Sequence, residues 1–179
     1  VRWDSRHRCA AAGRKAGPPG LSTHRQYVPA RLAKTDGIVE LAKVARRYGG
    51  IYATHQRSEA NALDESLAEV FQIARQAQIP VEIWHLKTAY KKNWGRMPEV
   101  LAQIKRARAA GLDITADIYP YIAGSTSLSA CLPPWALEGG TEKVLARLKD
   151  TAIRERLKKE ITTDSKDWEN IYLGSGGPS

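Results

Sequence analysis

Two histidines in this sequence have the type and spacing that metal chemistry requires. His55 ends the apolar stretch Ile51–His55, and His85 ends the stretch Val81–His85, thirty residues further along the chain. Neighbouring parallel strands lie ~4.8 Å apart, so equivalent positions at their ends can direct two imidazoles at one point. Neutral imidazole binds zinc, but a catalytic zinc takes three protein ligands and a water, so the pair would form part of a site. A hydrogen-bonded structural role for each histidine is the alternative.

Other polar residues follow these stretches and could bind a substrate. Lys87 lies two residues after His85, on the same side of an extended chain, where it could hold a carboxylate or simply be a solvated loop lysine. Tyr119 and Ser125 offer hydroxyls near the end of the next predicted strand, and both suit carboxylate or carbonyl binding. Asp117 precedes Tyr119 on that strand, and we interpret it as a structural carboxylate.

The elements that must position these residues repeat about every thirty residues. Apolar stretches starting near 51, 81 and 113 are predicted strands, and an earlier strand is expected around Gly20–Thr23. Amphipathic helices are predicted from residue 37 to Gly49, over 61–78 and over 97–110. This period is typical of βα units in a parallel sheet, so we predict an α/β fold, either a (β/α)8 barrel or a doubly wound sheet. No glycine-rich phosphate-binding motif follows a strand, which disfavours dinucleotide binding.

The predicted elements divide the sequence into three regions. Residues 1–19 show no helical or strand periodicity and are left as irregular. Residues 20–135 hold about four βα units, and because a complete barrel takes ~250 residues, they predict a partial (β/α)8 barrel. Residues 136–179 are predicted to contain a charged helix over 141–160, as an appended helical insertion, and the start of a further strand near Asp167.

The net charge of +9 does not indicate a nucleic-acid partner. Residues 1–35 contain eight Lys and Arg against one acid, whereas the remaining 144 residues contain 20 basic and 18 acidic side chains. A phosphate-binding surface spreads its basic residues over a folded face. No apolar run is long enough for a membrane span, no signal-peptide core is present, and two cysteines cannot form a disulfide framework. We expect a cytoplasmic protein without membrane or nucleic-acid partners.

The motifs together resemble those of a known enzyme family. They are Ile51–His55 with Arg57, Val81–Lys87, Asn93–Met97, and Asp117–Tyr121 with Ser125–Leu128. In this order they resemble the N-acyl-D-amino-acid deacylases, or D-aminoacylases, of the amidohydrolase superfamily. The resemblance extends from about Gly20 to Ser179.

The resemblance implies a metal-dependent (β/α)8 barrel that hydrolyses a small-molecule N-acyl-D-amino acid to a carboxylate and a free D-amino acid. His55 and His85 match histidines that bind zinc in the family. Lys87, Tyr119 and Ser125 match positions that bind the carboxylate of the substrate.

The sequence also departs from the family. The His-x-His of the first strand, a metal-bridging cysteine and the general-base aspartate of the last strand have no counterpart, so we expect an internal piece of a longer enzyme that is inactive alone. His24-Arg25 stands where the family usually has Gly-Leu. Two alternatives stay open. One is another amidohydrolase, such as a hydantoinase or dihydroorotase, and the other is a non-catalytic barrel fragment.

Overall fold

The computed structural model describes residues 20–26, 30–161 and 171–172. The chain divides into two compact units, Val1–Tyr119 and Pro120–Ser179, and each unit is described by itself. The predicted irregular segment 1–19 and the predicted strand near Asp167 lie outside the described residues. The predicted division into regions at residue 135 stays a prediction.

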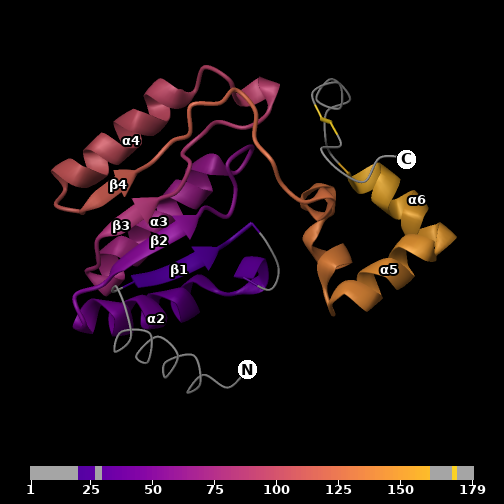
Figure 1. The fold of residues 1–179 in the computed structure, drawn as a ribbon, viewed down its shortest axis with the longest axis horizontal. Helices are drawn as coiled ribbons and strands as arrows, with labels where there is room; N and C mark the ends of the chain where they lie inside the picture. The colour runs from indigo at the N-terminus through magenta and orange to yellow at the C-terminus, as the bar shows by residue number, and fades with distance from the viewer. Residues whose placement is uncertain (1–19, 27–29, 162–170, 173–179) are drawn as a thin grey trace. The chain divides into compact units, whose positions relative to one another are not determined.

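The described part of the first unit is built on a four-stranded parallel sheet (Figure 1). The strands are β1 (Gly20–His24), β2 (Ile51–His55), β3 (Val81–Ile83) and β4 (Ile114–Ala116). Their order in the sheet is their order in the sequence, and each consecutive pair is parallel. The predicted α/β class with a parallel sheet is therefore confirmed.

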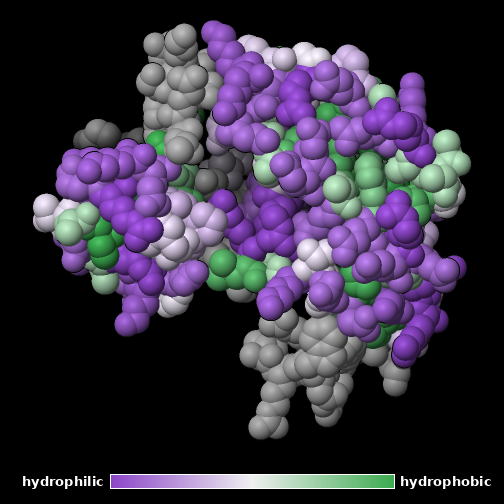
Figure 2. Space-filling view, turned by 180° about the vertical axis from the view of Figure 1, so that it is seen from behind, coloured by the Kyte–Doolittle hydropathy of each residue, from purple (hydrophilic) through white to green (hydrophobic). Residues whose placement is uncertain are grey.

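Helices alternate with these strands, as the thirty-residue period predicts. They are α2 (Thr35–Arg47), α3 (Leu63–Ala77) and α4 (Met97–Ala109). Their apolar faces share one core with the strands, and fully buried Leu67, Ile73 and Val100 meet Ile83 and Ile114 there. Exposed hydrophobic side chains also occur, as the green residues among purple ones in Figure 2 show.

Polar side chains fix the pairing of the first two strands. Thr23 Oγ1 lies 2.8 Å from the Tyr52 hydroxyl and 2.9 Å from Thr54 Oγ1, and all three side chains are buried. Side chains alternate along a strand, so His24 and His55 point to the opposite face from Thr23 and Thr54. The register pairs His24 with His55 directly.

Two strands, β3 and β4, end earlier than the sequence predicts. β3 ends at Ile83, so His85 is not the last residue of a strand; it lies in a turn with a φ of 44°, in the left-handed region. The carboxylate of Asp117 accepts the His85 backbone N–H there. β4 likewise ends at Ala116, before Tyr119. The apolar character of both stretches continues past the point where the backbone leaves the sheet.

Within the described residues of the second unit, the helix predicted over 141–160 is two α-helices. α5 (Thr141–Lys149) and α6 (Thr151–Glu160) are separated at Asp150, whose side-chain oxygen accepts the Ile153 N–H at 2.9 Å and caps α6. Within this unit, Trp135 Nε1 donates to Glu160 at 2.6 Å, and the Arg156 guanidinium lies 4.0 Å from the centre of the Trp135 ring. None of the described helices has the length and apolarity needed to cross a bilayer.

Candidate metal centre

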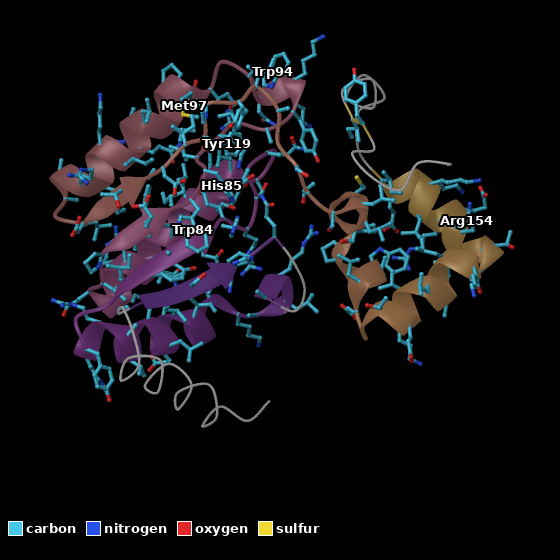
Figure 3. The ribbon with its side chains drawn as sticks, in the orientation of Figure 1. Trp84, His85, Trp94, Met97, Tyr119 and Arg154 are labelled. Carbon is cyan, nitrogen blue, oxygen red and sulfur yellow. The ribbon has the colours of Figure 1, made fainter. Side chains whose placement is uncertain are left out.

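Four aromatic side chains gather at the carboxyl ends of β1, β2 and β3. The ring centres of His24 and His55 are 4.3 Å apart, and those of His55 and His85 are 4.2 Å apart. Trp84 meets His55 edge-on, with a centroid distance of 5.0 Å and an interplanar angle of 79°. Figure 3 labels Trp84, His85 and Tyr119 in this region of the sheet. The parallel sheet thus sets three imidazoles side by side, each from a different strand or from the turn that follows it.

The two predicted site histidines face each other through their ring nitrogens. His55 Nδ1 and His85 Nε2 are in direct contact. The sequence therefore predicts this juxtaposition correctly, although His85 reaches it from a turn beyond β3. Two imidazole nitrogens directed at one point suit a borderline-soft cation such as zinc.

The environment keeps His55 neutral. Burial is the largest cause and, together with the neighbouring charges of His85, His24 and Lys87, it lowers the pKa of His55 to about 4, while Glu59 acts in the opposite direction. Neutral imidazole is the form that binds metal ions. His55 therefore carries the lone pairs that a metal ligand needs at neutral pH.

Glu59 is a residue of this site that the sequence analysis misses. Its side chain is 9% exposed and lies in the connection between β2 and α3. One carboxylate oxygen, Oε2, accepts a hydrogen bond from Lys87 Nζ at 2.8 Å, and the other, Oε1, lies 2.7 Å from His85 Nδ1. The sequence marks Glu59 only as an acidic residue four positions after His55, the histidine that ends a strand.

Lys87 and Tyr119 lie beside His85. Lys87 Nζ is 2.7 Å from His85 Nδ1 and 5.4 Å from the centre of the Tyr119 ring. Burial and the negative charge of Glu59 raise the pKa of the Tyr119 hydroxyl above its ordinary value near 10. Ser125 belongs to the second unit, and its predicted role stays a prediction.

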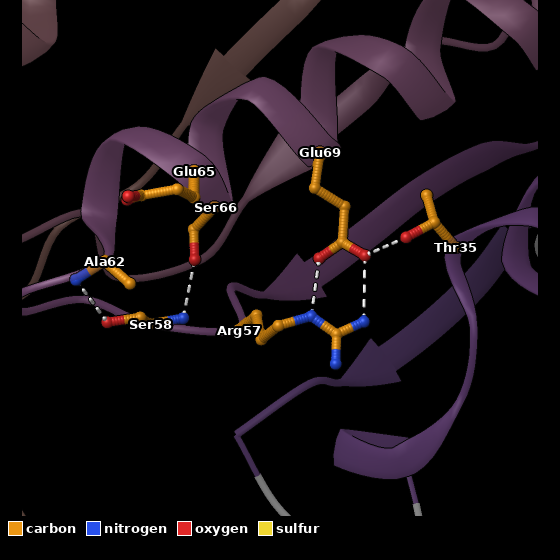
Figure 4. A pocket seen from close by; sticks show the side chains of 7 residues that line it. All are labelled: Thr35, Arg57, Ser58, Ala62, Glu65, Ser66 and Glu69. Atoms are coloured by element: carbon orange, nitrogen blue, oxygen red, sulfur yellow. Dashed lines mark hydrogen bonds and ion pairs between the residues drawn. The ribbon is translucent and has the colours of Figure 1, made fainter.

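Arg57, two residues after His55, holds the loop that follows β2 (Figure 4). Its Nε and NH2 donate to the two oxygens of Glu69 at 3.0 and 2.9 Å, and its NH1 donates to the Arg31 carbonyl. Glu69 also accepts from Thr35 and from the buried Arg25, at 2.5 and 2.6 Å. A pocket of about 260 Å³ opens beside this cluster, and none of the three histidines lines it. Arg57 therefore anchors the backbone after His55 and has its donors occupied within the protein.

The described residues do not contain a complete set of metal ligands. Within residues 20–26, 30–161 and 171–172, no group of three or more His, Cys, Asp or Glu side chains is arranged to hold a metal ion. The structure brings two imidazole nitrogens together, whereas a catalytic zinc takes three protein ligands.

Comparison with known proteins shows what the chain resembles. No protein-family model matches it. It is 42% identical over 113 residues to a D-aminoacylase of Alcaligenes xylosoxydans xylosoxydans, a match that covers 63% of this chain and 23% of the relative. It is 37% identical over 121 residues to an N-acyl-D-glutamate deacylase of the same organism, covering 68% and 25%.

Solved structures of deacylases also resemble this chain. A D-aminoacylase crystal structure described as defining a novel subset of amidohydrolases matches 68% of this chain and 26% of its own, with a TM-score of 0.65 and 38% identity. An N-acyl-D-glutamate deacylase from Bordetella bronchiseptica, complexed with zinc and a phosphonate inhibitor, matches 66% and 25%, with a TM-score of 0.64 and 33% identity. A D-hydantoinase shares the fold alone, with a TM-score of 0.50 and 14% identity.

These matches confirm the resemblance to the N-acyl-D-amino-acid deacylases over about two thirds of the chain. The chain spans about a quarter of the length of the curated relatives that it matches.

Proposed function

We propose that this chain is part of a zinc-dependent N-acyl-D-amino-acid deacylase, which hydrolyses the amide of a small N-acyl-D-amino acid. One observation carries the proposal: His55 Nδ1 and His85 Nε2 face each other in a chain that is 37–42% identical to such deacylases over 113–121 residues. We further propose that the four-stranded sheet is an arc of a (β/α)8 barrel. The active site of such a barrel lies at the carboxyl ends of its strands, where these histidines are found.

His55 and His85 would hold the zinc in this proposal, with a further protein ligand from outside the described residues. Bound zinc polarises the amide carbonyl and lowers the pKa of its water to about 7. Trp84 packs edge-on against His55 and restricts the orientation of that ring.

Lys87 and Tyr119 would bind the carboxylate of the substrate. The Lys87 ammonium supplies the opposite charge, and the protonated Tyr119 hydroxyl can donate a hydrogen bond. For Ser125, in the second unit, a carboxylate-binding role rests on the family resemblance alone. The general base has no match in this sequence, so we assign no proton transfer to these residues.

The hydantoinase alternative rests on a likeness of fold at 14% identity, so the deacylase is the better supported reading. Hydrolysis of N-acetyl-D-amino acids, compared with that of cyclic ureides, by the longer enzyme that contains this segment separates the two. The cytoplasmic location and the absence of membrane and nucleic-acid partners stay predictions.

Zinc titration of the purified chain by calorimetry tests the proposed ligands. We expect His55→Ala and His85→Ala each to weaken zinc binding by more than ~100-fold, because loss of an outer partner of a ligand alone costs about 10–100-fold. His24→Ala is the matched control, since it removes a neighbouring imidazole that is not a proposed ligand, and it should leave the affinity unchanged. Equal zinc affinity in all four proteins would refute the assignment and favour the non-catalytic fragment.

A further inference from the structure

We propose that Glu59 is the positioning residue of this centre: it holds His85 in the tautomer that leaves Nε2 free to bind metal, and it holds Lys87 beside that ring. The proposal rests on the proposed function, in which His55 and His85 are the metal ligands. Neither the family resemblance nor the comparisons with known proteins assign a role to Glu59.

The first argument is that one buried oxygen of the Glu59 carboxylate has no hydrogen-bond donor. The Glu59 side chain is 9% exposed, and its Oε1 accepts no hydrogen bond within the described part of the chain. Buried polar atoms require partners, and a carboxylate can only accept. The nitrogen that lies 2.7 Å from Oε1 is His85 Nδ1. This contact lies outside hydrogen-bond geometry in the structure, and a small rotation of the His85 ring brings a proton on Nδ1 to this oxygen.

The second argument concerns the other ring nitrogen. A neutral imidazole has one protonated and one unprotonated nitrogen, so a proton on Nδ1 leaves the lone pair on Nε2. His85 Nε2 is the atom that contacts His55 Nδ1. Glu59 therefore sets the tautomer that a metal at this point requires, in the manner of carboxylates that orient metal-binding histidines.

Lys87 also contacts His85 Nδ1, and on its own it would favour the other tautomer of the ring. Its Nζ is 2.7 Å from the same His85 Nδ1, and a hydrogen bond from Lys87 to Nδ1 would place the ring proton on Nε2. Glu59 Oε2 also accepts a hydrogen bond from Lys87 Nζ at 2.8 Å, so the Glu59 carboxylate lies against both the Lys87 ammonium and His85 Nδ1. Without the negative charge of Glu59, the Lys87 ammonium beside Nδ1 favours the tautomer whose proton lies on Nε2.

The backbone around Glu59 holds the carboxylate in place. The Glu59 carbonyl accepts the Ala89 N–H at 2.7 Å, which links this loop to the segment after His85. The Ser58 N–H donates to Ser66 Oγ at 2.7 Å, which fixes the same loop to α3. The loop thus positions Glu59 before any metal binds.

Two measurements on the full chain test the role of Glu59. The first is the ring tautomer of His85 in the metal-free protein, from ¹H–¹⁵N correlation NMR with the signal assigned by its loss in His85→Ala. We expect the proton on Nδ1 in the unsubstituted chain and a shift toward Nε2 in Glu59→Gln, which lacks the charge. A proton on Nε2 in the unsubstituted chain would overturn the proposal.

The second measurement is zinc affinity. Glu59→Gln should raise the zinc dissociation constant about 10–100-fold. Glu65→Gln is the matched control, because Glu65 is an exposed acid on the neighbouring helix, and it should bind zinc like the parent chain. An unchanged dissociation constant in Glu59→Gln would overturn the proposal. If the parent chain binds no zinc, the proposed metal site fails, whereas the tautomer of His85 still decides the role of Glu59.

Discussion

Replacing Glu69 with glutamine should strongly destabilise the fold, because Glu69 is the carboxylate that compensates two arginines. Glu69 accepts four hydrogen bonds, two of them from Arg57 and one each from Arg25 and Thr35. The Arg25 side chain is 1% exposed, and its Nε and NH1 have no hydrogen-bond partner within the described residues. Glutamine keeps the shape, removes the charge and turns an amide NH₂ toward these donors.

The magnitude follows from the burial of Arg25. Breaking a buried pair by removing one partner leaves an uncompensated charge and costs about 3–5 kcal/mol. Since domains typically have unfolding free energies of roughly 5–15 kcal/mol, this is a large share of the total. With a denaturant slope of about 1–3 kcal/mol per molar urea, the midpoint should fall by about 1 M or more.

The assay is urea unfolding of the chain, followed by circular dichroism. Glu65→Gln, one turn earlier on α3 and exposed, is the control and should change the unfolding free energy by less than about 0.5 kcal/mol. If the urea midpoint of Glu69→Gln matches that of the control, the negative charge of Glu69 does not stabilise the fold by compensating Arg25 and Arg57, and the reasoning is refuted.

Three further outcomes are expected. Leu67→Ala, at a fully buried position of α3, should cost about 2–5 kcal/mol in urea unfolding, whereas Leu101→Ala, at a side chain 44% exposed, should cost much less; equal losses would contradict the assigned core. Asp150→Ala should weaken α6 by about 0.5–2 kcal/mol through loss of its cap, seen as faster amide exchange in α6 than in α5, and unchanged exchange would argue against the cap. Burial raises the pKa of Tyr52, so its contribution to stability is present below pH 10 and is lost as the pH rises through the folded-state pKa. Tyr52→Phe should therefore flatten the alkaline loss of stability, and an identical pH profile in both proteins would refute this.

The sequence predicts the alternation of strands and helices well because hydrophobic periodicity records burial directly. The stretch Ile51–His55 is a strand with the predicted bounds, and the helix predicted over 61–78 is α3 at Leu63–Ala77. The helix predicted over 141–160 fails as a single element because Asp150 caps a new helix there. Its apolar positions continue across the break, so periodicity alone cannot show it.

The site is predicted only in part, because its remaining members depend on contacts between distant loops. His55 and His85 are found from the thirty-residue repeat, which places them at one edge of the sheet. The turn at His85 depends on Asp117, 32 residues away, and no local pattern encodes that hydrogen bond. Glu59 has no motif of its own, and its role emerges only when Lys87 and His85 lie next to it.

The central claim is that His55 and His85 share one metal ion, and anomalous diffraction at the zinc edge tests it most directly. Crystals of the chain grown with zinc should show one peak about 2.0–2.1 Å from both His55 Nδ1 and His85 Nε2. A zinc peak bound elsewhere, with none between these two nitrogens, would contradict the proposed centre.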